Sequence, residues 1–346
     1  MSTLLTRVTA PGTMAQVRHV SPVRPGAARG LVAEVYAQVE RDFGMLAPPV
    51  IMHSPAPETM AACWLLLRES LLASGTVSRV HKEVVATEVS AGNSCPYCVD
   101  VHQATLRGIS RRADPGLERV ASWARSSGVR ETAERHPPPL LTGHSRELVA
   151  VAVTFQYLNR MVNVFLGDSP LPPEVPQGAR GAALRLFGLV MRPAARRSCP
   201  KGDSLSLLPA APPPADLAWT RGSGHLEGAF ARAVEVVEEG GRRRLPESVR
   251  ELVAAQVAAW EGHPPPGLGR GWVEGVVAGV PEGQRASARL ALLTALASYQ
   301  VDSAVVADFQ RGEPDQGALI EVTSWAALTA ARRVGAWLPL TQSAHT

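Results

Sequence analysis

The chain has 346 residues, a net charge of +4 and four cysteines; 5% of its residues are aromatic and 19% are charged. Four cysteines are too few for a secreted disulfide scaffold, and the arginines are not interleaved with aromatic residues as in a nucleic-acid surface. The longest apolar run, near residues 148–158, is too short to span a bilayer. Ala, Leu, Val and Arg are the most frequent residues, which favours helices in a chain long enough for two domains.

The first 33 residues contain no acidic residue and no continuous apolar segment. They therefore lack the apolar core of a signal peptide. Because proline and glycine are frequent here, we expect residues 1–29 to form a flexible arm. Met14 offers a second candidate start of translation.

Apolar residues recur at helical spacing through residues 30–166. The predicted helices cover residues 30–43, 58–73, 81–91, a stretch that begins near Cys95, 117–126, 130–135 and 145–166. Pro48-Pro49 ends the first of these helices, and Pro137-Pro138-Pro139 precedes the last. The sequence therefore predicts an all-α domain over residues 30–166.

Several polar or reactive side chains lie on these predicted helices. Cys63 belongs to a largely apolar stretch, and we interpret it as a core residue. The helix over residues 145–166 carries four polar residues whose groups need partners when buried: Tyr157, Asn159, Arg160 and Asn163. We interpret the four as a structural network, with a place in the functional site as the alternative.

Prolines recur between residues 167 and 214, which predicts an extended connector with one helix over residues 179–197. Cys199 lies in this connector, and we interpret it as an incidental thiol, with a regulatory role as the alternative. Residues 215–340 then form a second helical half that contains no cysteine.

The second half has sequence features in common with the first. Residues 251–257 echo residues 83–89, and residues 290–306 echo the helix over 148–165. His263 stands where the first half has Cys95. We therefore predict two pseudo-repeated halves, the second degenerate; a chance match between helices rich in Ala and Val is the alternative.

The most informative motif is Cys95-Pro-Tyr-Cys98 followed by His102. Two thiols at this spacing can form a disulfide with each other and so carry two electrons. On a helix, Cys95, Cys98 and His102 lie on one face. Glu83 lies on the preceding predicted helix, and a break at Gly92-Asn93 lets the second helix fold back across the first. A carboxylate there could set the histidine tautomer or relay a proton.

The start of the dithiol helix also has recognisable signals. Pro96 suits the first turn, where its missing N–H costs nothing. Ser94 or Asn93 suits the N-cap position. Cys95 would then belong to the first turn, at the positive end of the helix.

Other readings of this motif remain open. A zinc site formed by Cys95, Cys98, His102 and Glu83 would have four ligands, although the chain has no second C-x-x-C pair. Two inert, buried cysteines are a further alternative. Covalent haem attachment is excluded because Val99, and not histidine, follows the second cysteine.

The stretch from Glu83 through Cys95 and Cys98 to His102 resembles the signature of the alkylhydroperoxidase D family, within the carboxymuconolactone decarboxylase superfamily. The resemblance is strong over residues 45–110. It implies an all-α helical bundle, a homo-oligomer and a dithiol peroxidase that reduces alkyl or hydrogen peroxides. One departure is Tyr97, which stands where the best-studied type has a second histidine.

The spacing, together with the resemblance, suggests a mechanism. Because Cys98 is nearest His102 in the helical register, we expect it to be the peroxidatic thiolate, with its proton taken by Glu83 through His102; exchanged roles for Cys95 and Cys98 are the alternative. Cys95, which we expect to be the more exposed thiol, would form the disulfide and exchange with an external dithiol of the lipoyl or thioredoxin type. The alternative is a thiol–disulfide oxidoreductase or redox sensor without peroxide turnover. We predict no cofactor, no metal, no nucleic-acid or membrane partner, and a cytoplasmic location.

Overall fold

The computed structural model describes residues 11–110, 115–139, 142–172, 174–267 and 269–340. Within these ranges the chain is mainly helical, and the only β-type pairing is an isolated bridge between Ala73 and Cys199. The main helices are α2 (Gly30–Phe43), α3 (Pro48–Ile51), α4 (Pro57–Leu67), α5 (Arg79–Gly92), α6 (Pro96–Ile109), α7 (Pro115–Ser126), α8 (Arg130–Arg135), α9 (Thr142–Phe165), α10 (Gln177–Ala195), α11 (Gly224–Arg244), α12 (Glu247–Ala259), α13 (Gly271–Val277), α14 (Arg285–Ala297), α15 (Ser303–Gly312) and α16 (Gln316–Gly335). Short helical turns cover η1 (Pro25–Ala27), η2 (Arg68–Leu72), η3 (Leu205–Leu207), η4 (Ala215–Thr220), η5 (Glu282–Gln284) and η6 (Ser298–Gln300). The prediction of an all-α protein is confirmed.

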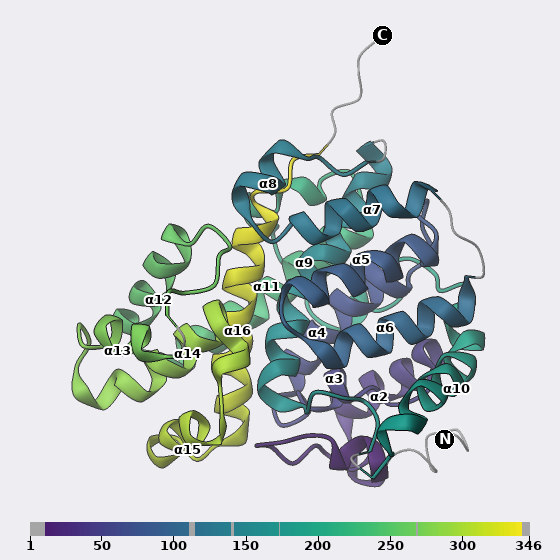
Figure 1. The fold of residues 1–346 in the computed structure, drawn as a ribbon. Coiled ribbons are helices and arrows are strands. Elements are labelled where there is room, and N and C mark those ends of the chain that lie inside the picture. Colours follow the sequence, from purple (N-terminus) through teal and green to yellow (C-terminus); the bar gives the residue numbers. More distant parts are fainter. Residues whose placement is uncertain (1–10, 111–114, 140–141, 173, 268, 341–346) are drawn as a thin grey trace.

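Helix α9 lies at the centre of the fold, in contact with α4, α5 and α16 (Figure 1). Its segment His144–Phe165 is long and apolar enough to cross a membrane, but 94% of that segment's apolar window is buried inside the protein. A helix that is apolar on all sides suits such a position, because every face meets another helix. Within the described residues it is therefore a core helix.

Helix α2 shows how the local sequence sets the elements around this centre. Val32, Val35, Tyr36 and Val39 recur at helical spacing and are all buried. The helix ends at Gly44, whose φ of 92° is a left-handed conformation that glycine adopts without strain. The predicted bounds of this helix, residues 30–43, match the structure.

The predicted helix over residues 58–73 changes its winding part-way. Helix α4 ends at Leu67, and the next turn, Arg68–Leu72, is a π-helix. Arg68 and Glu69 both lie in this wider turn and both are fully buried. Periodicity alone did not reveal the change, because a π-turn is held by the tertiary contacts of its side chains.

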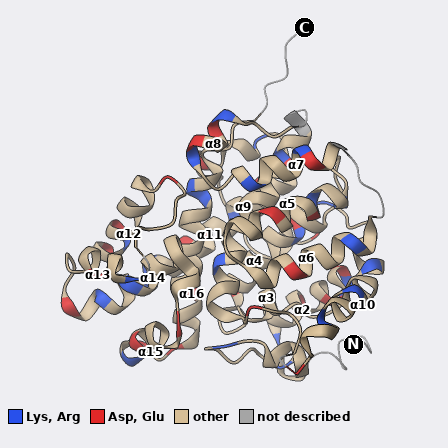
Figure 2. Ribbon diagram, viewed as in Figure 1, with Lys and Arg blue, Asp and Glu red and all other residues tan. Residues whose placement is uncertain are grey.

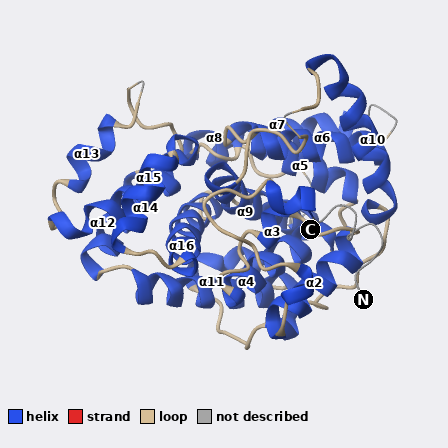
Figure 3. Ribbon diagram, turned by 90° about the horizontal axis from the view of Figure 1, so that it is seen from below, coloured by secondary structure: helices blue, strands red, loops and turns tan. Residues whose placement is uncertain are grey.

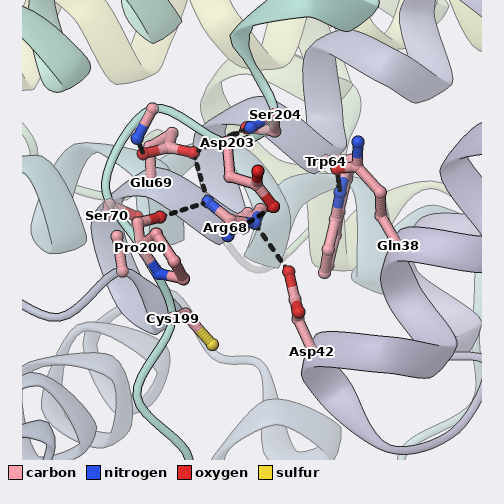
Figure 4. A network of polar contacts seen from close by, with 12 residues as sticks. Gln38, Asp42, Trp64, Arg68, Glu69, Ser70, Cys199, Pro200, Asp203 and Ser204 are labelled. Atoms are coloured by element: carbon pink, nitrogen blue, oxygen red, sulfur yellow. Dashed lines mark hydrogen bonds and ion pairs between the residues drawn. The ribbon is translucent and has the colours of Figure 1, made fainter.

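Those contacts form a buried ion cluster around Arg68 (Figure 4). Its guanidinium contacts Asp42 of α2 at 2.7 Å and Glu69 at 2.6 Å. Glu69 in turn accepts hydrogen bonds from the backbone N–H of Gly202 at 2.7 Å and from the hydroxyl of Ser204 at 2.7 Å. The cluster therefore fastens the end of the proline-rich connector to the protein body.

Cys199 lies beside this cluster and is 2% exposed. Its backbone N–H donates to the hydroxyl of Ser74, and the N–H of Ser74 donates to its carbonyl. Burial raises the pKa of the Cys199 thiol. Cys63 is fully buried, as expected for a core thiol, and burial raises its pKa as well.

The connector also adds a helix to the protein body, because its helix α10 packs along α6. The two helices meet backbone to backbone at a pair of glycines. A Cβ atom added to Gly188 would lie 2.1 Å from the carbonyl oxygen of Ala104, and one added to Gly108 would lie 2.3 Å from that of Gly188. The predicted helix over residues 179–197 is thus present and is held close to the dithiol helix.

Residues 11–29, where we expected a flexible arm, lie against the protein body. The N–H of Arg18 donates to the carbonyl of Phe165 at 2.8 Å, and the N–H of Val23 donates to the hydroxyl of Ser54 at 2.8 Å. The hydroxyl of Tyr36 donates to the carbonyl of Val23 at 2.7 Å. These hydrogen bonds hold part of this proline-rich stretch against the protein body; residues 1–10 of the expected arm lie outside the described residues.

Helices α12 to α15 lie together on the far side of α16 from α5 and α6 (Figures 1 and 3). The helix predicted over residues 290–306 is interrupted there: α14 ends at Ala297, and α15 begins at Ser303. The side chain of Asp302 caps α15 by accepting from the N–H groups of Ala304 and Val305, which starts a new helix. The internal repeat stays a prediction.

Candidate active site

The turn between α5 and α6 brings the motif residues together. Ser78 caps the start of α5 by accepting a hydrogen bond from the N–H of His81. After α5, Ser94 adopts a left-handed φ of 51°, and the N–H of Cys95 donates to the carbonyl of Ser90 at 3.0 Å. This tight reversal lays α6 back against α5, as the glycine–asparagine break predicted.

The start of α6 differs by one position from the prediction. Cys95 is itself the N-cap, with φ of −112° and ψ of 81°, and Pro96 is the first helical residue. Neither Ser94 nor Asn93 can cap the helix, because both residues take part in the reversal after α5. Proline at the first helical position is as expected.

Glu83 and His102 form a buried pair across the two helices. Nδ1 of His102 lies 2.7 Å from Oε2 of Glu83, and both residues are buried. The imidazole ring also packs edge to face on Phe155, with 4.6 Å between ring centres and 88° between planes. Because a carboxylate only accepts hydrogen bonds, Nδ1 donates, and the neutral ring then has its lone pair on Nε2.

Arg79 keeps the carboxylate of Glu83 charged. Burial alone would raise the pKa of Glu83, but the charges of Arg79 and His102 and their hydrogen bonds bring the pKa below its ordinary value. The guanidinium of Arg79 lies 2.7 Å from Oε1 of Glu83, one helical turn away. A charged acceptor is therefore held against Nδ1 of His102 in a dry environment.

Both cysteines of the motif are buried free thiols. Cys95 is 1% exposed and Cys98 is 4% exposed, so the expectation that Cys95 is the more exposed thiol is wrong. The reason is the N-cap position, which places Cys95 in the reversal between α5 and α6. Of the two, it is Cys98 that reaches the neighbouring cavity.

The environment of Cys98 disfavours its thiolate in the reduced protein. Burial and the neighbouring Cys95 raise the pKa of Cys98 well above its ordinary value. Hydrogen bonds from Asn159 and Ser90 act in the opposite direction. The amide of Asn159 also donates to Ser90 at 2.9 Å, and it accepts from the amide of Asn93 at 3.0 Å.

The four polar residues of α9 thus divide between two roles. Asn159 belongs to the site, through Cys98. Tyr157 and Arg160 are held by partners elsewhere in the described structure: the hydroxyl of Tyr157 pairs with the ring of His53 at 2.9 Å, and Arg160 donates to the carbonyl of Ala295 at 2.8 Å. Asn163 donates to the carbonyl of Asn93 at 3.2 Å and so supports the reversal between α5 and α6. Of the four, Asn159 is the residue that acts on Cys98 and supports the alternative of a role in the site.

A cavity of about 450 Å³ opens onto Cys98 and His102. Its wall is mostly apolar and comes from α6, α9, α10, the segment after α2 and residues near position 12. The lining residues are Gly12, Thr13, Gln16, Phe43, Met45, Ala47, Pro48, Pro49, Leu67, Tyr97, Cys98, Val101, His102, Phe155, Leu158, Val162, Pro170, Ala183, Leu186, Phe187 and Val190. A cavity of this size and character accommodates a small organic molecule.

Tyr97 connects this cavity to the N-terminal segment. Its hydroxyl donates to the side-chain oxygen of Gln16 at 2.8 Å. Burial raises its pKa, with the neighbouring Cys98 and Cys95 adding to the effect. Tyr97 is therefore a neutral hydrogen-bond donor and cannot act as the second histidine would.

Part of this site was not found from the sequence. Arg79 precedes Glu83 by four residues, so an ion pair along the helix could have been predicted. Gln16 and the wall formed by α10 carry no local signal, because tertiary packing alone brings them to α6. The described residues contain no group of three or more His, Cys, Asp or Glu side chains arranged to hold a metal ion.

The fold and the site together define an all-α protein with a buried C-x-x-C pair facing an apolar cavity. The family model of the carboxymuconolactone decarboxylase family matches residues 57–125, which include α4, α5 and α6. The chain is also 37% identical over 338 residues to the alkyl hydroperoxide reductase Rv2159c of Mycobacterium tuberculosis, covering 93% of this chain and 95% of that relative. The chain belongs to the alkylhydroperoxidase D-like group of the carboxymuconolactone decarboxylase superfamily.

Proposed function

We propose that this protein is a dithiol peroxidase that reduces alkyl or hydrogen peroxides through Cys95 and Cys98. The observation that carries the proposal is the meeting of Cys98 and His102 on one apolar cavity, with His102 held by Glu83. The relative from Mycobacterium tuberculosis bears the name alkyl hydroperoxide reductase, which supports an oxidoreductase of the alkylhydroperoxidase type.

The first step is proton removal from Cys98. Because its pKa is raised, Cys98 is a thiol at neutral pH and needs a base. His102 accepts the proton on Nε2, directly or through a water, and the resulting imidazolium is stabilised by the carboxylate of Glu83. Ser90 and Asn159 favour the thiolate as it forms.

The thiolate sulfur of Cys98 then attacks the terminal oxygen of the peroxide. The O–O bond breaks, the sulfur becomes a sulfenic acid, and the alcohol or water leaves with the proton from His102. The sulfur of Cys95 next attacks the sulfenic acid; a disulfide forms and water leaves. The two electrons have then passed from the dithiol to the peroxide.

An external dithiol must return two electrons to this disulfide. Because both thiols are buried and Cys98 faces the cavity, we propose that the reductant attacks the Cys98 sulfur and releases Cys95. A slender dithiol of the lipoyl type fits a cavity of about 450 Å³ better than a folded thioredoxin-like partner. A cytoplasmic location and a homo-oligomer remain predictions.

A second candidate function is favoured by Tyr97. Its neutral hydroxyl is committed to Gln16 and supplies no second base, so thiol–disulfide exchange or redox sensing without peroxide turnover is the alternative. The two functions differ in whether peroxide is consumed.

The test is peroxide consumption by the reduced protein with dihydrolipoamide as donor. Cys98→Ser should lose turnover completely, whereas Cys199→Ser, a change at a buried thiol outside the site, should retain it. Turnover by Cys98→Ser at the wild-type rate would disprove the assignment. If the wild-type protein consumes no peroxide but forms a reducible Cys95–Cys98 disulfide, the exchange or sensing function is favoured.

A further inference from the structure

A second cavity, of about 350 Å³, lies at the start of α5 and is lined by neither cysteine of the motif. Its wall is formed by the start of α5, the loop before it, the end of α6 and the end of α10. The lining residues are Leu71, Leu72, Ala73, Ser74, Gly75, Val77, Ser78, Arg79, Val80, Lys82, Ile109, Ala195, Arg196, Arg197 and Ser198. Nothing in the dithiol mechanism uses this cavity.

All charged residues in the lining of this cavity are basic. Four basic residues line it and no acidic residue does. Arg79 and Lys82 are paired with Glu83 and Glu147, whose carboxylates lie outside the lining. The other two cations come from the end of α10, where basic segments gather beside α6 (Figure 2).

Arg196 and Arg197 are exposed, and within the described residues neither forms an ion pair with a carboxylate. Arg196 donates to the carbonyl of Ile109 at 3.4 Å, and Arg197 donates to the carbonyl of Arg41. Each guanidinium carries five N–H donors, so most of its donors are available for a ligand. Two such residues in the lining of one cavity offer charged donors to an anion.

Three serine hydroxyls also belong to the lining of the cavity, those of Ser74, Ser78 and Ser198. Ser74 and Ser198 contact each other at 3.0 Å across the wall. Ser78 caps α5, a helix of fourteen residues whose N-terminus carries partial positive charge. Leu72, and the other apolar residues of the wall, leave room beside these donors for an uncharged organic group.

We infer that this cavity binds a soluble phosphate monoester. Guanidinium groups match phosphate oxygens two at a time, and a phosphate offers more oxygens and more charge than a carboxylate does. The apolar part of the wall would contact the organic group attached to the phosphate. Binding of the phosphate monoester can be measured without peroxide turnover.

Arg79 connects the new site with the dithiol site. Arg79 lines the cavity, and its guanidinium holds Oε1 of Glu83 at 2.7 Å. A bound phosphate therefore competes with Glu83 for the same cation. This link rests on the proposed role of Glu83, but it is measurable as binding alone.

The binding test uses isothermal titration calorimetry with phenyl phosphate, inorganic phosphate and acetate as probes. Phenyl phosphate should bind most tightly, inorganic phosphate more weakly, and acetate not detectably. Replacing both Arg196 and Arg197 by alanine should weaken phosphate binding at least about tenfold, whereas Arg185→Ala, which removes an exposed charge elsewhere on α10, should leave it unchanged. Unchanged binding by the double variant, or acetate binding as tightly as phosphate, would overturn the site.

The link through Arg79 has its own measurement. Glu83→Gln removes the competing carboxylate and should tighten phosphate binding about threefold or more. Circular dichroism confirms that each variant is folded. If Glu83→Gln does not fold, the measurement is made on the wild-type protein, as the protection of Arg79 by phosphate against modification by phenylglyoxal. Equal affinity, or no protection, would refute the link, and neither readout depends on peroxidase activity.

Discussion

His53 makes a testable contribution to the dependence of stability on pH. It is fully buried, with Nε2 2.9 Å from the hydroxyl of Tyr157, and burial lowers its pKa from 6.5 to about 4. As pH falls, the unfolded chain therefore takes up a proton on this histidine before the folded chain does. Its contribution is full above the unfolded pKa and is lost as pH falls towards the folded pKa. Linkage gives a loss of about 2 kcal/mol between about pH 7.5 and about pH 5.

The matched variant is His53→Gln, which removes the titrating group and keeps a polar partner for Tyr157. Urea unfolding at the two pH values, followed by circular dichroism, gives the free energy of unfolding of each protein. The wild type should lose about 2 kcal/mol more than the variant on acidification. His19 and His225, whose pKa values burial also lowers, titrate in both proteins and cancel. Equal losses in the two proteins would refute the assignment of a neutral, buried His53.

Glu83→Gln should lower kcat for peroxide consumption about a hundredfold, because the imidazolium loses its counter-charge; an unchanged kcat in steady-state assays would contradict the relay. Gly188→Ala should destabilise the protein by about 1–3 kcal/mol, because its Cβ would collide with the carbonyl of Ala104. Thermal unfolding measures this effect, with the unobstructed Gly181→Ala as control. Arg68→Met should cost about 3–5 kcal/mol in urea unfolding, since it leaves the buried carboxylate of Glu69 without a cation and leaves Asp42 with Arg41 alone; a loss below about 1 kcal/mol would contradict that reasoning.

Structural features that depend on residues close together in the sequence could be predicted from the sequence. The helical bounds of α2 and the pairing of Glu83 with His102 depend on residue spacing and on a short reversal. The burial of Cys95 could not be predicted, because it depends on a left-handed Ser94 that local propensity does not favour. The π-turn at Arg68 likewise depends on partners more than one hundred residues later in the chain.

The glycine pair between α6 and α10 sets the shape of the cavity at Cys98 independently of the side chains that line it. Gly108 and Gly188 let one helix rest on the backbone of the other, so the spacing of that wall does not depend on the side chains that face the cavity. Leu186 and Phe187, on the same helix, line the cavity but do not form this contact. During evolution or engineering, such positions can exchange one apolar side chain for another and change which molecules enter. The two glycines have no such freedom, and they are the positions at which divergence of this pocket is most constrained.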